Sequence, residues 1–194
     1  MFQRPLHLAA CLQTLAPTLL LDGDDTRNAT AWGQKGEGFP FRIASIEHAA
    51  KLARDFEHTV IDTGQKPSED DLKALMEGCD LLIVPAVPAN LDNDGLALTI
   101  NALRGMGASS YRVLLTKVPP PPESEGADLR AELLKEGVPM FSADIPRLKV
   151  FEKAVGAGTT VGNSKIFPAK DRPMAARAWA AYQSVANEVM TNGK

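Results

Sequence analysis

Residues 18–22 read Thr-Leu-Leu-Leu-Asp, and this stretch decides the fold class. A short run without charges that ends in a carboxylate is typical of a strand buried on both faces of a parallel sheet. Directly before it, between Pro5 and Ala16, apolar residues recur at three- and four-residue steps. Pro5 suits a first helical turn, so we expect a helix over this stretch, followed at once by the strand.

The same helix-then-strand unit recurs along the chain. The expected strands are 59–62, 81–84, 113–116 and 138–141, and the helices before them are 46–56, 69–77, 91–106 and 128–136. Two more helices are expected at 148–154 and 172–190. Strands that alternate with helices at this spacing form right-handed crossovers in a parallel sheet. The predicted fold is therefore α/β, a mostly parallel sheet with helices on both faces, built by residues 1–194 as a single domain.

Composition excludes several classes of protein. The chain is 44% hydrophobic and 23% charged, as in soluble globular proteins, and its net charge of -3 is too balanced for a chain that binds nucleic acid over its whole surface. The longest apolar runs, such as 81–87, fall far below the roughly 20 residues that span a bilayer. No cleavage pattern follows the N-terminal apolar stretch, so a cytoplasmic location without membrane contact is expected.

Carboxylates cluster at the ends of two predicted strands. Asp22, Asp24 and Asp25 follow the first strand, and Asp62 closes the strand at 59–62. Carboxyl ends of neighbouring parallel strands meet at one edge of a sheet, which is where functional groups gather. Magnesium takes one or two carboxylates together with phosphate oxygens. These residues therefore indicate a magnesium and phosphate site, and the alternative for the first cluster is an acidic, solvated turn.

The motifs resemble those of the ParA/MinD group of partition ATPases, which are deviant Walker-type P-loop proteins. Residues 19–24 with Asn28-Ala29-Thr30 resemble the second-strand motif, and Val60-Ile61-Asp62-Thr63 resembles the Walker B strand. The segments 80–88, 112–121 and 144–154 resemble the later strands and loops of that group.

The resemblance implies a set of ligands and roles. ATP and Mg²⁺ would be the cofactors, with Asp22 as the catalytic residue that positions the attacking water and Asp62 reaching the metal through water. The residues implied on the nucleotide are Asp24, Thr116, Pro119 and Pro146.

One part of the family pattern has no counterpart in this sequence. The family's first strand and its loop Lys-Gly-Gly-x-Gly-Lys-Thr-Thr cradle the phosphates, and no such loop occurs in the 194 residues. The resemblance places that strand between 81–84 and 113–116. We expect a missing N-terminal piece; a decayed remnant and a sheet that closes over the gap are the alternatives. As written, the chain is expected to be deficient in hydrolysis.

The resemblance also implies partners. Arg147, Lys149 and Lys153 would bind DNA nonspecifically through its phosphates, and an ordinary solvated helix face is the alternative. A ParA-like plasmid or chromosome partition protein would form an ATP-dependent homodimer, work with a centromere-binding ParB-like partner and associate with the nucleoid. The alternatives are a non-enzymatic interaction module and a relative that positions protein cargo such as carboxysomes.

Overall fold

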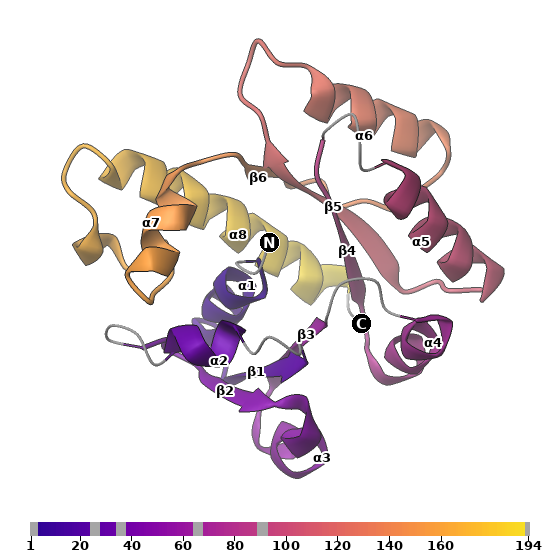
Figure 1. Cartoon of the computed structure of the whole chain (residues 1–194), viewed down its shortest axis with the longest axis horizontal. Coiled ribbons are helices and arrows are strands. Elements are labelled where there is room, and N and C mark those ends of the chain that lie inside the picture. Colours follow the sequence, from indigo (N-terminus) through magenta and orange to yellow (C-terminus); the bar gives the residue numbers. More distant parts are fainter. Residues whose placement is uncertain (1–3, 24–27, 34–37, 64–67, 89–92, 193–194) are drawn as a thin grey trace. The chain divides into compact units, whose positions relative to one another are not determined.

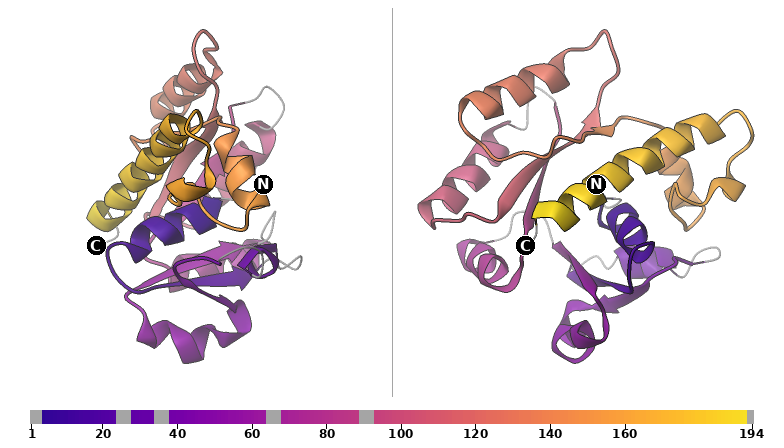
Figure 2. Two further views of the ribbon diagram at one scale, coloured as in Figure 1. Left: turned by 90° about the vertical axis from the view of Figure 1, so that its left-hand side faces the viewer. Right: turned by 180° about the vertical axis from the view of Figure 1, so that it is seen from behind.

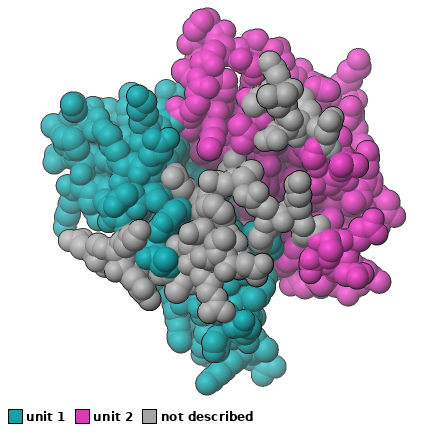
Figure 3. Space-filling view, viewed as in Figure 1, with its two compact units in different colours: residues 1–66, 148–186 teal, residues 67–147, 187–194 magenta. Residues whose placement is uncertain are grey.

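The computed structural model describes residues 4–23, 28–33, 38–63, 68–88 and 93–192. The chain divides into two compact units, coloured separately in Figure 3. Unit 1 holds residues 1–66 and 148–186, and unit 2 holds residues 67–147 and 187–194. The single domain expected from the sequence stays a prediction, and each unit is described by itself.

Unit 1 is built on a parallel sheet in the order β2-β1-β3. Its strands are β1 (Thr18–Gly23), β2 (Arg42–Ser45) and β3 (His58–Thr63). The helices that accompany them are α1 (Arg4–Gln13), α2 (Asn28–Gly33) and α3 (Ala49–Leu52), the last flanked by 3-10 turns at Ile46–His48 and Ala53–Asp55. The unit also contains α7 (Val150–Gly156), a 3-10 turn at Ser164–Ile166 and most of α8 (Arg172–Asn192).

The two faces of this sheet are covered by different helices. Leu20 packs with Ile43 and Val60 on one face, in a core that includes Leu6 and Ala9 of α1. Side chains of a strand alternate between faces, so Leu19 and Leu21 point the other way, and they pack with Leu52 of α3. Figures 1 and 2 show α1 and α3 on opposite sides of the sheet. Unit 1 therefore has the predicted architecture, a parallel sheet with helices on both faces.

Unit 2 repeats the design with the sheet order β4-β5-β6. The strands are β4 (Leu82–Ala86), β5 (Tyr111–Val118) and the two-residue β6 (Ile145–Pro146). The helices are α4 (Glu69–Gly78), α5 (Asn93–Gly105) and α6 (Glu125–Lys135). Alternate residues of β5, namely Tyr111, Val113 and Leu115, join Leu103 of α5 and Leu129 of α6 in one core.

Several sequence expectations need correction. β4 pairs directly with β5, from Leu82 opposite Tyr111 to Ala86 opposite Leu115, so no strand lies between them in this chain, as expected for the alternative of a sheet that closes over the gap. The strand expected at 138–141 is reduced to a single bridge between Val113 and Met140. The third strand of this sheet is β6 instead. Sequence patterns missed β2 and α2, since four and six residues are too short for a clear period.

In the part of the chain that the structure describes, no helix is both long enough and apolar enough to cross a membrane. The longest helix, α8, carries Arg177 and Glu188 and exposes many of its residues.

Candidate functional site

Asp22 and Asp62 occupy paired positions on neighbouring strands. In the parallel pairing of β1 with β3, the Cα of Asp22 lies opposite that of Asp62. On its other side Asp22 lies opposite Ser45 of β2. Paired residues of adjacent strands point to the same face of a sheet, so the two carboxylates and the hydroxyl form a row across the carboxyl end of the sheet. The sequence prediction that Asp22 and Asp62 meet at one sheet edge is confirmed.

The face on which this row lies follows from alternation along the strands. Asp22 and Asp62 lie two residues beyond Leu20 and Val60, which pack in the core under α1. Asp22 is only 4% exposed, whereas Asp62 is partly exposed. The row therefore continues the α1 face of the sheet, with one carboxylate enclosed and the other open to solvent.

The strand ends approach each other closely at Gly23. A Cβ on Gly23 would lie 2.9 Å from the backbone oxygen of Asp62 and 3.2 Å from the Cδ1 of Ile46. Because real Cβ atoms do not come this near a backbone oxygen, only glycine fits here without moving the chain that carries Asp62. Gly23 thus sets the spacing of the two strand ends just past the carboxylates.

The donor set suits a hard divalent cation bound from one side. Two neighbouring carboxylates match the one or two that Mg²⁺ usually takes, with water and phosphate oxygens completing its shell. Among the described residues, no group of three or more histidine, cysteine, aspartate or glutamate side chains could hold a metal ion. Asp24 lies outside the described residues, so its predicted role stays a prediction.

The other predicted nucleotide residues gather in unit 2. Thr116 is buried in β5, and its Oγ1 donates to the carbonyl of Ala86 over 3.1 Å. Thr116 pairs with Ile145, and Pro146 pairs with Val118, so β6 lies beside the carboxyl end of β5. Pro119 is buried directly after that strand. The structure therefore brings Thr116, Pro119 and Pro146 to one end of the unit 2 sheet.

This end of β5 is irregular. The pairing with β6 shifts register between Thr116 and Val118. Lys117, which lies between them, has a φ of 55°, in the left-handed region that residues other than glycine seldom adopt. Bulges of this kind re-aim side chains and are frequent beside functional sites. The bulge separates buried Thr116 from the exposed side chain of Lys117.

The three predicted DNA-binding cations have different surroundings. Arg147, in unit 2, donates from Nη2 to Oε1 of Glu123 over 2.5 Å. Lys153, in unit 1, pairs with Asp171 over 2.5 Å. Lys149, also in unit 1, is exposed. Two of the three cations are therefore already paired with a carboxylate of this chain.

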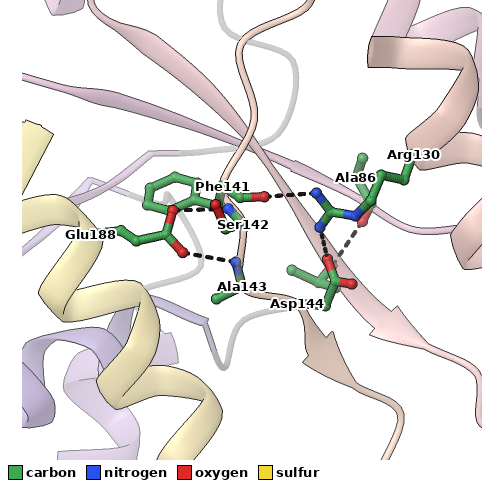
Figure 4. A network of polar contacts seen from close by, with 8 residues as sticks. Ala86, Arg130, Phe141, Ser142, Ala143, Asp144 and Glu188 are labelled. Atoms are coloured by element: carbon green, nitrogen blue, oxygen red, sulfur yellow. Dashed lines mark hydrogen bonds and ion pairs between the residues drawn. The ribbon is translucent and has the colours of Figure 1, made fainter.

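Sequence reasoning missed a polar network in unit 2. Glu188 accepts hydrogen bonds from the backbone of Ser142 and Ala143, and Arg130 contacts both the carbonyl of Phe141 and the carboxylate of Asp144 (Figure 4). The partners of Glu188 lie more than forty residues away in the sequence. No local spacing pattern signals such a contact.

The two cysteines are poor nucleophiles. Burial raises the pKa of the Cys11 thiol to about 12. Burial, and secondarily the negative charge of Asp80, raises the pKa of Cys79. Since the thiolate is the reactive form, neither residue suits thiol chemistry at neutral pH.

Comparisons with known proteins agree with the family that the motifs resemble. No protein-family model matches the chain. It is 29% identical over 162 residues to maintenance of carboxysome distribution protein A from Gloeobacter kilaueensis, which covers 80% of this chain and 75% of that relative.

Solved structures show the same fold. The apo McdA structure from Cyanthece superposes with a TM-score of 0.68 at 12% identity, covering 93% of this chain and 92% of that one. A putative plasmid partition protein from Borrelia burgdorferi bound to AMPPNP gives a TM-score of 0.67 at 15% identity, covering 97% and 91%. The structural neighbours are thus ParA/MinD-type partition ATPases, and the resemblance read from the motifs is confirmed.

Proposed function

We propose that this chain, which has the fold of ParA/MinD-type partition ATPases, is a positioning protein that uses ATP and Mg²⁺ at the carboxyl end of β1 and β3. The observation that carries the proposal is the direct pairing of Asp22 with Asp62 on one face of the sheet. Bound Mg²⁺ would neutralise charge on the phosphates. Asp62, the more exposed carboxylate, would hold the metal through water, and the enclosed Asp22 would orient the attacking water.

The cargo we propose is a protein assembly of the carboxysome kind. The support is the sequence relationship to a carboxysome distribution protein, which is a more specific likeness than that of the fold alone. Plasmid or chromosome segregation, with a ParB-like partner, is the second candidate, supported by the likeness of the fold to a plasmid partition protein.

We further propose that these 194 residues hydrolyse ATP poorly. No lysine-bearing phosphate loop of the family type occurs in the sequence. Phosphoryl transfer depends mostly on positioning and charge neutralisation, which that lysine supplies. Within unit 1, the contact to the nucleotide would come from Asp62 with its metal. A non-enzymatic module that binds DNA or a partner protein with the same surfaces is the alternative.

DNA binding and dimerisation complete the proposed cycle. Arg147, Lys149 and Lys153 would contact DNA phosphates without reading bases, and a nucleotide-dependent homodimer would double this charge. The protein would work in the cytoplasm on the nucleoid surface.

The test is a titration of the chain with ATP, with and without Mg²⁺, followed by NMR. We expect Mg²⁺-dependent shifts of residues at the ends of β1 and β3, with an affinity weaker than micromolar. Asp22→Asn and Asp62→Asn should abolish the Mg²⁺ dependence, and Asp55→Asn, which changes an exposed carboxylate of unit 1, should preserve it. Micromolar affinity would mean that another segment replaces the phosphate loop, and Mg²⁺-independent shifts would exclude the Asp22 and Asp62 site.

A further inference from the structure

The backbone between Met140 and Pro146 leaves the side of β5 and then returns to it. Phe141 donates from its amide to the carbonyl of Val113 over 2.9 Å, which is the last ladder contact before the break. Pairing resumes where Ile145 lies opposite Thr116. Residues 142–144 thus form a gap in the ladder, and their backbone groups need other partners.

Glu188 provides hydrogen-bond acceptors for two backbone amides in this gap. The two carboxylate oxygens of Glu188 accept from the amides of Ser142 and Ala143, over 2.8 and 2.7 Å. Glu188 is partly buried near the end of α8, in the portion that belongs to unit 2. Hydrogen bonds to an ionised acceptor are about twice as strong as those between neutral groups. One side chain therefore replaces two missing ladder partners.

Arg130 contacts the residues at the two ends of the gap, Phe141 and Asp144. Nη1 of Arg130, on α6, donates to the carbonyl of Phe141 over 2.9 Å, and Nη2 contacts the carboxylate of Asp144. The side chains of Arg130 and Asp144 are 24% and 34% exposed, so water screens this pair only in part. Figure 4 shows Glu188 and Arg130 reaching the segment from opposite sides. Together they restrain both ends of the gap.

The strand β6 comes directly after the gap and leads into Arg147. Pro146 pairs with Val118, and the amide of Arg147 donates to the carbonyl of Val118 over 2.8 Å. A two-residue strand makes few hydrogen bonds of its own. Its register against β5 therefore depends on the position of residues 142–144, which directly precede it. We propose that Arg130 and Glu188 are positioning residues that set the register of β6 and so place Pro146 against the nucleotide base. The part concerning the base rests on the proposed function.

The direct test is amide hydrogen exchange, measured by NMR on the full chain. In Glu188→Ala, exchange at Ser142 and Ala143 should accelerate on the order of tenfold or more, because both acceptors are lost. Arg147, which does not contact Glu188, should also exchange faster if β6 depends on the gap. Glu188→Gln keeps one acceptor oxygen and should give an intermediate effect. Arg130→Met should accelerate hydrogen exchange at the Arg147 amide in the same way.

Matched controls on α6 separate this from a general loss of stability. Glu132→Ala and Lys135→Met remove exposed charges from the same helix and should leave all three amides unchanged. The amide of Phe141, bonded to Val113, should stay protected in every variant that folds. Should Glu188→Ala fail to fold, Glu188→Gln and Arg130→Lys carry the test.

The functional readout is the preference for ATP over GTP in an NMR titration. We expect the preference to fall about tenfold in Glu188→Ala and Arg130→Met, since displaced positioning groups commonly cost this much or more. Unchanged exchange at Arg147 would overturn the proposal, and so would faster exchange with the base preference retained. If the wild-type chain binds neither nucleotide, the proposed function fails. The hydrogen-exchange rate of the Arg147 amide alone then decides whether Arg130 and Glu188 position β6.

Discussion

Asp22 of β1 and Asp62 of β3 are paired residues of adjacent parallel strands. Their side chains lie on the same face of the sheet, at its carboxyl end. Asp22 is almost completely enclosed, and Asp62 is partly open to solvent. Carboxylate oxygens are the ligands that Mg²⁺ prefers, and it usually takes one or two carboxylates. The relationship between Asp22 and Asp62 therefore suits cation binding.

Cation binding at this pair predicts how Mg²⁺ affects stability, because a ligand that binds only the folded chain stabilises it. Mg²⁺ should raise the melting temperature of the wild-type chain and leave that of the Asp22→Asn, Asp62→Asn double variant unchanged. Thermal unfolding at several Mg²⁺ concentrations, with Asp55→Asn as control, measures both effects. Equal Mg²⁺ stabilisation of the double variant would show that the cation binds elsewhere.

The close approach at Gly23 predicts a costly substitution. In Gly23→Ala the new Cβ would come within 2.9 Å of the Asp62 carbonyl oxygen, so the ends of β1 and β3 must move apart. We expect a loss of about 1–3 kcal/mol in the free energy of unfolding, as for other overpacked sites. Urea unfolding measures the loss. Gly78→Ala is the control, because no atom lies within 4 Å of its would-be Cβ, and a loss equal to that of Gly23→Ala would contradict the steric argument.

The buried hydroxyl of Thr116 links β5 to β4. Thr116→Val keeps the shape of the side chain but leaves the Ala86 carbonyl without this donor, and about 1–2 kcal/mol of stability should be lost. Thr116→Ser retains the hydroxyl and reports the loss of the methyl group alone. Chemical denaturation compares the two, and a smaller loss in Thr116→Val than in Thr116→Ser would show that the hydrogen bond contributes little.

The N-terminus of α4 carries a capping box that depends on pH. The amide of Asp71 donates to Oγ of Ser68, and the amide of Ser68 donates to the Asp71 carboxylate. Hydrogen bonds from the side chain and backbone of Ser68 lower the pKa of Asp71. A carboxyl with a lowered folded-state pKa stabilises the fold above its ordinary pKa of about 3.9, and this contribution disappears as the pH falls through the lowered value.

Removing the cap gives the corresponding test. Ser68→Ala should cost about 0.5–2 kcal/mol at neutral pH, as other N-cap serines do. In Asp71→Asn the part of the acid sensitivity that comes from this carboxyl should vanish. Unfolding free energies measured from pH 7 to pH 2 test this, and identical pH profiles for Asp71→Asn and wild type would rule out the linkage.

The ion pairs of Arg147 and Lys153 predict opposite effects on DNA binding. Arg147→Ala, Lys149→Ala and Lys153→Ala should each weaken binding equally for unrelated sequences and lower the slope of log K against log salt by about 0.9. Glu123→Gln and Asp171→Asn should strengthen binding, because each releases a cation from its carboxylate. Fluorescence anisotropy at several salt concentrations measures these effects, with Lys135→Met as control. Sequence-dependent losses would indicate base contacts instead of phosphate contacts.

Much of the architecture follows from local sequence. Runs such as 18–22 and 59–62 carry no charge before their last residue and are too short for helices, and each ends in a carboxylate that marks the strand's end. The strands β1 and β3 were predictable for this reason, and the helices α4, α5 and α6 lie close to their expected ranges, whereas α2 was missed. The pairing of Asp22 with Asp62 was predictable too, because parallel strands of similar length bring their carboxyl ends together.

Other features depend on contacts between distant segments. Direct pairing of β4 with β5 was one of several alternatives that the sequence left open, since strand order depends on which apolar faces pack together and not on the residues of either strand alone. The same holds for β6. Residues 138–141 resemble a strand more closely, yet it is Ile145–Pro146 that pairs with β5, and the backbone between them is bonded to Arg130 of the preceding helix α6 and to Glu188 of the distant helix α8. Local patterns specify where strands and helices form, and long-range hydrogen bonds and packing specify which of them meet.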